Sequence, residues 1–237
     1  MGGDIKMGYM GYVKELIQRQ PSNSVIEAER VYRMLPYPIS RRAYNKILMQ
    51  MVRAGEIIPM EEGVYCCARK SCTGVLTLPS DREIAAYYIE DNRGLYIGYS
   101  LYRAKGLTTQ ISKKTEVLSV GIKKERINIR GVDIERLPER LSPNLVYVVE
   151  ILEILEHYGE VEDFNHCRFL HYMEEYSRLY SEVDVQRVLA LRIYKKTTIA
   201  LLKRYLEHFG VQNNLGKLLS SKEMNTVMSE EKIYEFT

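Results

Sequence analysis

The chain contains no Trp, only 4 Phe and only 4 Cys among its 237 residues, and its formal net charge is only +3. The cysteines, Cys66, Cys67, Cys72 and Cys167, form no Cys-x-x-Cys pair, which argues against a zinc ribbon or a thiol redox motif. We therefore expect reduced thiols in a cytoplasmic protein. Because the sequence has neither an apolar run of about 18 residues nor a signal-peptide core at its N-terminus, we expect no membrane span and no secretory leader.

Common catalytic motifs are absent as well, since the sequence contains no P-loop, HExxH, GxSxG or GxGxxG pattern. His166, Cys167 and His171 lie close together, but no second half of a metal site or nucleophile pair accompanies them, so we expect a partly buried structural role. Asp133 and Glu135 share one face of a predicted strand, but without a third acid for Mg²⁺ a solvent-facing strand edge is the simpler interpretation, and a nuclease is disfavoured. We predict no enzyme activity, no metal and no cofactor.

Charge is distributed unevenly along the chain. Residues 1–75 carry 11 Lys and Arg against 7 Asp and Glu, whereas residues 145–175 carry 8 acids and one Arg. Residues 187–217 carry 7 Lys and Arg and one acid. This late basic segment could bind nucleic acid or pack against the acidic segment, and we favour packing because opposite charge is available within the chain. Its helical basic residues are Arg187, Arg192, Lys195, Lys196, Lys203 and Arg204.

Three helices are predicted in the N-terminal part. The first covers about residues 7–20, with Val13 and Ile17 in its apolar stripe, and the second covers about residues 28–34. The run LPYPIS then prohibits helix, because each proline lacks an N–H. Ser40 is a good N-cap for the third helix, since its hydroxyl can accept from an amide of the first turn.

The third helix, residues 40–54, has two different faces when it is projected at about 100° per residue. Its apolar half consists of Ala43, Tyr44, Ile47, Leu48, Met51 and Val52. Its other half consists of Arg42, Asn45, Lys46, Met49, Gln50 and Arg53, with Arg41 near the border. In the major groove Arg binds guanine and Asn or Gln binds adenine, and Arg41 could reach a phosphate. The DNA-binding residues are predicted to be Arg41, Arg42, Asn45, Lys46, Gln50 and Arg53; the alternative is that they are ordinary solvated groups of a surface helix.

A glycine-turned hairpin is predicted after this helix. Gly55 ends the helix, and the runs EIIPM and GVYCCA form two short strands around Gly63, which supplies a positive φ. Pro59 suits an edge strand. This order of helices and hairpin predicts a winged helix-turn-helix, a unit that can place a helix in a DNA groove. The hairpin tip carries Glu61 and Glu62, which phosphates repel, so the wing either points away from DNA or approaches it through its backbone alone.

The middle of the chain is predicted to form a small α/β unit. Ser80 and Glu83 form a capping box at the start of a helix, beyond whose end lies Gly94. Gly98 and Gly106 bracket a second, short helix. The runs TEVLSVGI and ERINIRGVDIERLP indicate strands, and the glycine within the second run turns or bulges the chain.

The C-terminal part is predicted to be helical. Ser142 and Pro143 open a helix that stops at Gly159, a second helix covers about residues 165–180, and a third covers about residues 183–208, with a break near residues 197–198. Residues beyond about 213 are polar and are expected to fray or to pack loosely. The fold class predicted from these patterns is α+β: a winged helix-turn-helix domain in residues 1–72, then an α/β unit and a helical segment in residues 73–237.

The runs MVRAGEIIPMEEGVY, LTLPSDREIAAYY and YIGYSLYRAKGLTTQIS together resemble the AbiEi-type antitoxin family and its uncharacterised relatives. The downstream part of the resemblance is a "G … A … GL-T-Q" block, made here by Gly98, Ala104, Gly106, Leu107, Thr108 and Gln110. The resemblance covers roughly residues 10–135. The chain departs from the family pattern at Glu27, where a Ser or Thr usually caps the second helix, and at its acidic wing tip.

The resemblance implies a DNA-binding antitoxin of a type IV toxin–antitoxin system. Such a protein represses its own operon through the winged helix and opposes a nucleotidyltransferase toxin, usually without a stable complex. Operator DNA is the implied ligand; a homodimer on DNA stays open, because no dimer seam is visible in the sequence. A different interpretation also stays open: a protein-interaction module whose winged helix binds a protein partner, which the acidic tip at Glu61 and Glu62 favours.

Overall fold

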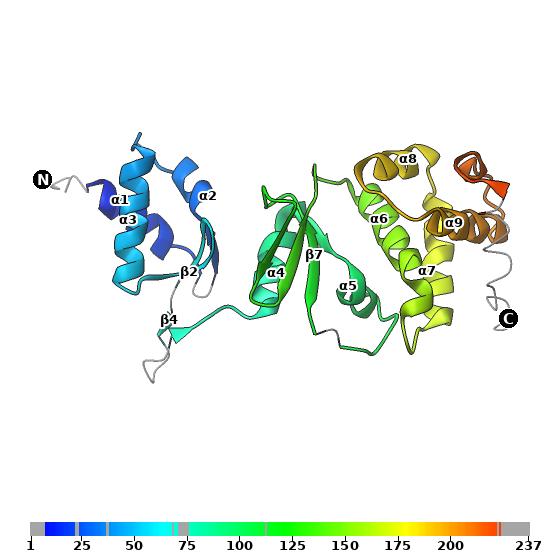
Figure 1. The fold of residues 1–237 in the computed structure, drawn as a ribbon, viewed down its shortest axis with the longest axis horizontal. Coiled ribbons are helices and arrows are strands. Elements are labelled where there is room, and N and C mark those ends of the chain that lie inside the picture. Colours follow the sequence, from blue (N-terminus) through cyan, green and yellow to red (C-terminus); the bar gives the residue numbers. More distant parts are fainter. Residues whose placement is uncertain are drawn as a thin grey trace, which may run out of the picture. The chain divides into compact units, whose positions relative to one another are not determined.

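A computed structural model describes the chain as an α+β protein (Figure 1). The residues that it describes are 8–21, 24–36, 38–67, 69–70, 76–111, 113–221 and 223. Position 72, the predicted end of the first domain, lies outside them. The chain forms two compact units, each defined by its internal contacts. The first consists of the residues up to Tyr87 together with Asn128–Val132, and the second consists of Tyr88–Ile127 and the residues from Asp133 onward. Each unit has its own hydrophobic core.

Three helices and a three-stranded antiparallel sheet form the first unit up to Cys67. The helices are α1 (Tyr9–Gln18), α2 (Ala28–Arg33) and α3 (Arg41–Arg53). The strands are β1 (Val25–Glu27), β2 (Ile57–Glu61) and β3 (Val64–Cys67), in the order β1-β3-β2. All three helix predictions are confirmed within the described residues, which begin after the predicted start at residue 7. The sequence did not indicate β1, because three residues are too few for a periodicity signal.

The side of α3 that faces the core is the predicted apolar side. Its buried residues are Tyr44, Ile47, Leu48 and Met51, and Val52 is half-buried. Ala43, predicted on the same side, is exposed. It lies in the first turn, about 90° around the helix from the centre of the buried side, so it falls on the border between the two faces.

Backbone hydrogen bonds at the end of α3 explain two predicted glycines. Gly55 has a φ of 69°, and its N–H donates to the Val52 carbonyl while the Glu56 N–H donates to the Met51 carbonyl, the pattern of a Schellman motif. Gly63, with a φ of 73°, closes the hairpin between β2 and β3. Pro59 lies on the edge strand β2, as predicted, where its missing N–H breaks no pairing with a further strand.

The middle of the chain adds two helices and six strands among the described residues. These are β4 (Arg69–Lys70), β5 (Leu76–Thr77), α4 (Asp81–Ile89), β6 (Gly94–Tyr96), α5 (Gly98–Ala104), β7 (Thr115–Ser119), β8 (Arg126–Ile129) and β9 (Val132–Arg136). The last four strands form a sheet in the order β6-β7-β9-β8. The capping box of α4 is confirmed, since the Ser80 N–H donates to the Glu83 carboxylate at 2.7 Å and the Glu83 N–H donates to the Ser80 hydroxyl at 3.3 Å.

Gly94 lies beyond the end of α4, as predicted, but a further turn separates it from the helix. The helix ends at Ile89, and a 3-10 turn follows in which Asp91 and Asn92 have φ angles of 58° and 56°. Gly94 begins β6, where a Cβ atom would lie 2.0 Å from the Leu118 carbonyl oxygen. The close approach of β7 therefore requires the glycine.

Helices dominate the chain after residue 142. They are α6 (Pro143–Glu156), α7 (His166–Leu179), α8 (Glu182–Leu191) and α9 (Lys196–His208). The central helix α6 contacts α5, α7, α8 and α9, and it is buried around most of its circumference. The Ser142 hydroxyl caps it by accepting from the Leu145 N–H, as expected for this start.

Two predictions about the C-terminal part were wrong in detail. The third predicted helix breaks before Lys196 rather than near residues 197–198, because the linker residues between α8 and α9 bind carboxylates of α6 and β9. The chain beyond residue 213 is not all frayed, since a short 3-10 helix (Leu215–Leu218) packs on α9 and buries Leu215 completely. Residues after 223 lie outside the described part. Among the described residues, no helix has the length and apolar character needed to cross a membrane.

Candidate nucleic-acid interface

Helix α3 is fixed to the first unit at both ends and along its buried side. The Ser40 hydroxyl accepts from the Ala43 N–H at its start. The Tyr44 side chain is fully buried, and its hydroxyl donates to the Ala28 carbonyl at 2.8 Å. Burial raises the pKa of Tyr44 well above its ordinary value, so the hydroxyl stays protonated as a donor. The outward face of the helix is therefore presented by a rigid element.

The outward face carries five of the six predicted DNA-binding residues in an exposed state. They are Arg42, Asn45, Lys46, Gln50 and Arg53. Within the part of the chain that the structure describes, none of these five side chains forms a hydrogen bond or an ion pair. An open depression on the surface is lined by Ser40, Arg42, Ala43, Asn45, Lys46, Met49, Gln50 and Arg53, so a single helix and its cap supply the whole lining. The structure thus brings five of the six predicted residues together on one accessible surface.

Arg41, the sixth predicted residue, is placed differently. Its guanidinium lies 3.9 Å from the centre of the Tyr32 ring and pairs with the Glu29 carboxylate of α2 at 2.8 Å. The side chain is still 49% exposed, but its charge is partly compensated within the unit. Sequence reasoning could not find this, because Glu29 and Tyr32 belong to another helix.

The predicted wing tip lies against the start of α2. The Gly63 carbonyl accepts a hydrogen bond from the Ala28 N–H at 2.9 Å, and Glu27 precedes α2 as an N-cap residue whose side chain makes no cap bond. The turn of the hairpin thus satisfies the first of the free amides at the start of α2. Glu62 is exposed at this turn, and Glu61 is half-exposed.

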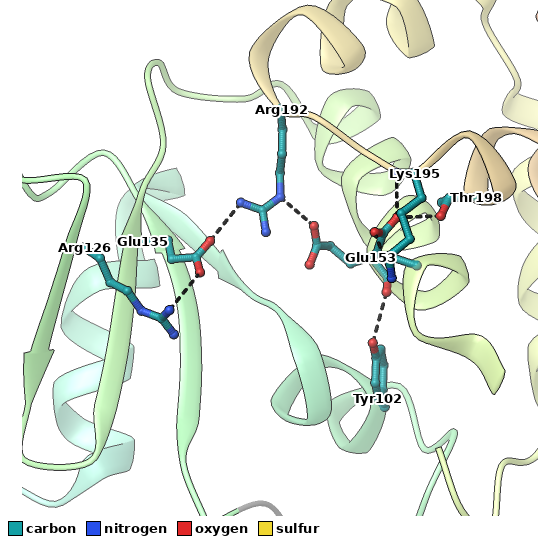
Figure 2. Close-up of polar contacts among 8 residues, drawn as sticks. Tyr102, Arg126, Glu135, Glu153, Arg192, Lys195 and Thr198 are labelled. Carbon is teal, nitrogen blue, oxygen red and sulfur yellow. Dashed lines mark hydrogen bonds and ion pairs between the residues drawn. The ribbon is translucent and has the colours of Figure 1, made fainter. Parts of the chain in front are cut away.

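The late basic segment contrasts with α3, because its charges are matched within the second unit (Figure 2). Arg192 donates to Glu153 of α6 at 2.7 Å and to Glu135 of β9 at 2.9 Å. Lys195 pairs with Glu156 at 3.4 Å, and its backbone N–H donates to the same carboxylate. The preferred prediction, packing against the acidic segment, is confirmed for these residues.

The other basic residues of this segment whose partners are known are also paired. Arg187 binds Glu139 at 2.6 Å, Lys203 binds Glu207 of its own helix at 2.6 Å, and the Lys196 ammonium donates to the Leu218 carbonyl. Burial alone would lower the pKa of Arg192, but the Glu153 carboxylate and the hydrogen bond to Glu135 outweigh it and raise the pKa above its ordinary value. These basic side chains of the segment therefore bind other parts of the second unit and do not form a free basic surface.

The paired acids of β9 are not a solvent-facing strand edge, as the sequence suggested. Asp133 is buried and pairs with Lys114 and Arg126, both at 3.4 Å, while Glu135 pairs with Arg192 and, at 3.9 Å, with Arg126. Glu116 of β7 adds a third carboxylate, and its pKa is raised by its burial and by Asp133. These acids are thus paired with basic side chains, and no group of His, Cys, Asp and Glu in the described residues is arranged to hold a metal.

The His and Cys residues of α7 differ in burial and in hydrogen-bond partners, so they do not form one site. His166 is half-buried, and its Nδ1 lies 2.8 Å from the Tyr158 hydroxyl, whereas His171 lies on the surface and pairs with Glu175 at 3.3 Å. Cys167 is exposed rather than partly buried, so the expected structural pair is wrong. It lies on the outer side of α7, opposite the buried Phe169 and Met173 stripe.

The residues that carry the family resemblance beyond the hairpin have packing roles. At Gly98, with a φ of 55°, a Cβ atom would lie 2.2 Å from a Glu116 carboxylate oxygen, and at Gly106, with a φ of 68°, it would lie 2.9 Å from the Arg168 guanidinium. The Thr108 hydroxyl donates to the Glu162 carbonyl, and the Gln110 amide donates to the carboxylate of the same residue. Gly98 thus allows close packing on β7 and Gly106 on α7, while Thr108 and Gln110 join the loop after α5 to the segment between α6 and α7.

Comparisons with known proteins leave the family open. No protein-family model matches the chain, and no curated protein matches it. A similar solved structure is the crystal structure of the Rv2827c protein from Mycobacterium tuberculosis, with 10% sequence identity and a TM-score of 0.41, over 92% of this chain and 79% of that chain. A similarity at this level assigns no function, so the case for one rests on the residues described above.

Proposed function

We propose that residues 8–67 form a winged helix-turn-helix that binds DNA through α3, and that the protein is a transcriptional repressor. The observation that carries this proposal is the contrast between two basic segments of one chain. In residues 187–204, Arg187, Arg192, Lys195 and Lys203 pair with carboxylates, and Lys196 donates to a carbonyl oxygen. On α3, by contrast, Arg42, Lys46 and Arg53 are exposed and have no partner among the described residues. Exposed cations without internal partners are free to replace the counterions of a phosphate backbone.

The chemistry of the face suits a duplex. Arg42, Lys46 and Arg53 supply charge for phosphates or for guanine, and Asn45 and Gln50 supply the paired donor and acceptor that recognise adenine in the major groove. In such modules the N-terminal residues of the recognition helix contact base edges. We therefore assign Arg42, Asn45 and Lys46 to base or near-base contacts, with Arg41 held at the border for a phosphate.

The wider role proposed is that of an AbiEi-like antitoxin, which autoregulates its operon and opposes a nucleotidyltransferase toxin without a stable complex. This rests on the resemblance of residues 10–135, whose glycines and Thr108 occupy the packing positions described above. The role needs no catalytic group, metal or cofactor in this chain, and it places the protein in the cytoplasm with its operator. A homodimer on a palindromic operator would fit a repressor of this class.

The DNA-binding proposal is tested by titrating the full chain into a labelled duplex from upstream of its own reading frame and into an unrelated duplex of equal length. We expect tighter binding to the first duplex, with submicromolar affinity of the order that specific complexes reach. Equal, weak binding to both duplexes at physiological salt would reject a specific repressor. The antitoxin role is tested separately, by co-expression with the neighbouring reading frame: rescue of growth supports it, and unchanged toxicity rejects it.

One observation favours a second candidate, a protein-interaction module. The hairpin turn presents Glu62, and Glu61 beside it, where a DNA-binding wing would offer cations. In that case α3 would contact an acidic protein partner through the same five side chains. Binding of the neighbouring gene product that is lost in the Arg42→Ala and Lys46→Ala variant, with no binding of any duplex, would establish this candidate over DNA.

A further inference from the structure

An apolar side chain lies at the centre of the polar face of α3. Met49 is 50% exposed, although its neighbours on this face are charged or amide side chains. At about 100° per residue, Met49 is within roughly 20° of Arg42 and roughly 40° of Arg53 around the helix axis. It lies between them along the axis, about 10 Å from the Arg42 level and about 6 Å from the Arg53 level.

Packing does not explain this methionine. The core of the first unit is built by the opposite side of α3, around Tyr44, Leu48 and Met51, and Met49 is not part of it. A lone exposed methionine on a helix needs no explanation by itself. A methionine at the centre of a surface proposed to enter the major groove does need an explanation. There a side chain either contacts the edge of a base or leaves a polar group of that base without a partner.

We propose that the DNA site of this protein contains a thymine whose C5-methyl group packs against Met49. This inference rests on the proposed function and adds the chemical class of one base pair that the helix reads. Thymine is the only base that presents an apolar group in the major groove, where a side chain without donors or acceptors contributes specificity. The unbranched thioether of methionine adapts its shape to such a contact.

The flanking residues support this placement. Asn45 lies one turn before Met49 and Arg53 one turn after it, so both border it on the same face. Asn45 can bind the edge of a purine on one side, and Arg53 can bind a phosphate or a guanine on the other. A methyl contact between two polar contacts excludes water from both, and thus adds to their discrimination.

The experiment replaces thymine by uracil, one position at a time, in the duplex that the full chain binds. This substitution removes a single methyl group and leaves every hydrogen-bonding group in place. Affinities are measured by fluorescence anisotropy for the wild type, for Met49→Ala and for Met49→Leu, which keeps an apolar side chain. Met34→Ala is the matched control, because Met34 is 52% exposed and is the C-cap residue that follows α2, outside the proposed surface.

For the wild type we expect one thymine position at which uracil weakens binding roughly fourfold, the effect of one buried methyl group. The same replacement should have no effect on Met49→Ala, while Met49→Leu and Met34→Ala retain the penalty. A duplex that is bound but shows no such position, or the same penalty in Met49→Ala, would overturn this inference and leave the DNA-binding proposal intact. Failure to bind any duplex would overturn both.

Discussion

The Arg41 guanidinium lies 3.9 Å above the ring of Tyr32, and this contact fixes the start of α3 to α2. The Tyr32 hydroxyl donates to the Ile39 carbonyl at 2.6 Å, and its ring lies 5.1 Å from the ring of Tyr44. A cation and two aromatic rings from both helices thus set the angle between them. Arg41 therefore has a structural role besides its proposed phosphate contact, and the residues after it carry the other proposed contacts.

Replacing Arg41 by Ala is expected to lower the free energy of unfolding by about 1 kcal/mol, through the lost cation–π contact and the lost Glu29 pair. Its effect on DNA affinity should be smaller than that of Arg42→Ala, whose side chain has no partner among the described residues. Urea denaturation and duplex titration of both variants measure the two effects. An Arg41→Ala protein of unchanged stability that binds DNA much more weakly than Arg42→Ala would reverse this assignment.

Arg192→Ala should destabilise the second unit by about 3 kcal/mol, because it leaves the buried Glu153 carboxylate without its partner. Arg187→Ala is the matched control, since its pair with Glu139 is on the surface and should contribute less than about 1 kcal/mol. Chemical denaturation measures both changes. Equal, small effects of the two substitutions would show that the contacts in Figure 2 do not stabilise the unit.

Glu116 predicts a pH dependence of stability with a definite sign. Burial, and then the Asp133 and Glu135 carboxylates, raise the pKa of Glu116 in the folded protein, although Arg126 and the Tyr99 N–H act against them. The folded state therefore holds this proton more tightly than the unfolded state. The stability that this proton supplies is fully present below the unfolded pKa and is lost as the pH rises through the folded value.

The measurement is the free energy of unfolding of the wild type and of Glu116→Gln between about pH 4 and pH 7. Because Gln does not titrate, the wild type should lose stability relative to the variant as the pH rises through this range. A difference that stays constant, or one that changes in the opposite direction, would contradict the environment described for Glu116.

Local signals made much of the fold predictable. The capping box at Ser80 and Glu83, and the glycines at positions 55 and 63, fix their elements through bonds within a few residues, and such bonds are readable from spacing. The short strands β1 and β6 were missed, since each exists only through pairing with a distant strand. The end of α8 depends in the same way on Glu135 and Glu153, which lie far away in the sequence.

The candidate site was likewise predictable where it depends on local spacing, and not where it depends on contacts with another helix. Helical projection places Arg42, Asn45 and Lys46 on one side of α3 because the spacing of a helix is regular. It could not show that Arg41 is held by α2, or that Ala43 would be exposed at the border, since both depend on where the next helix lies. Nor could charge counts separate Arg42, Lys46 and Arg53, which have no partner in the described part of the chain, from the paired cations of residues 187–204.

The salt dependence of duplex affinity reports directly on whether the exposed face of α3 binds DNA, because each cation that contacts a phosphate releases counterions. The full chain is titrated into the upstream duplex at several salt concentrations, as the wild type and as the double variant Arg42→Ala, Lys46→Ala. A matched double variant, Arg82→Ala with Arg103→Ala, removes two exposed cations from other helices. We expect weaker binding and a slope of log affinity against log salt smaller by roughly 2 for the α3 variant, and wild-type behaviour for the control. Unchanged affinity and slope in the α3 variant would show that this face of α3 does not bind DNA.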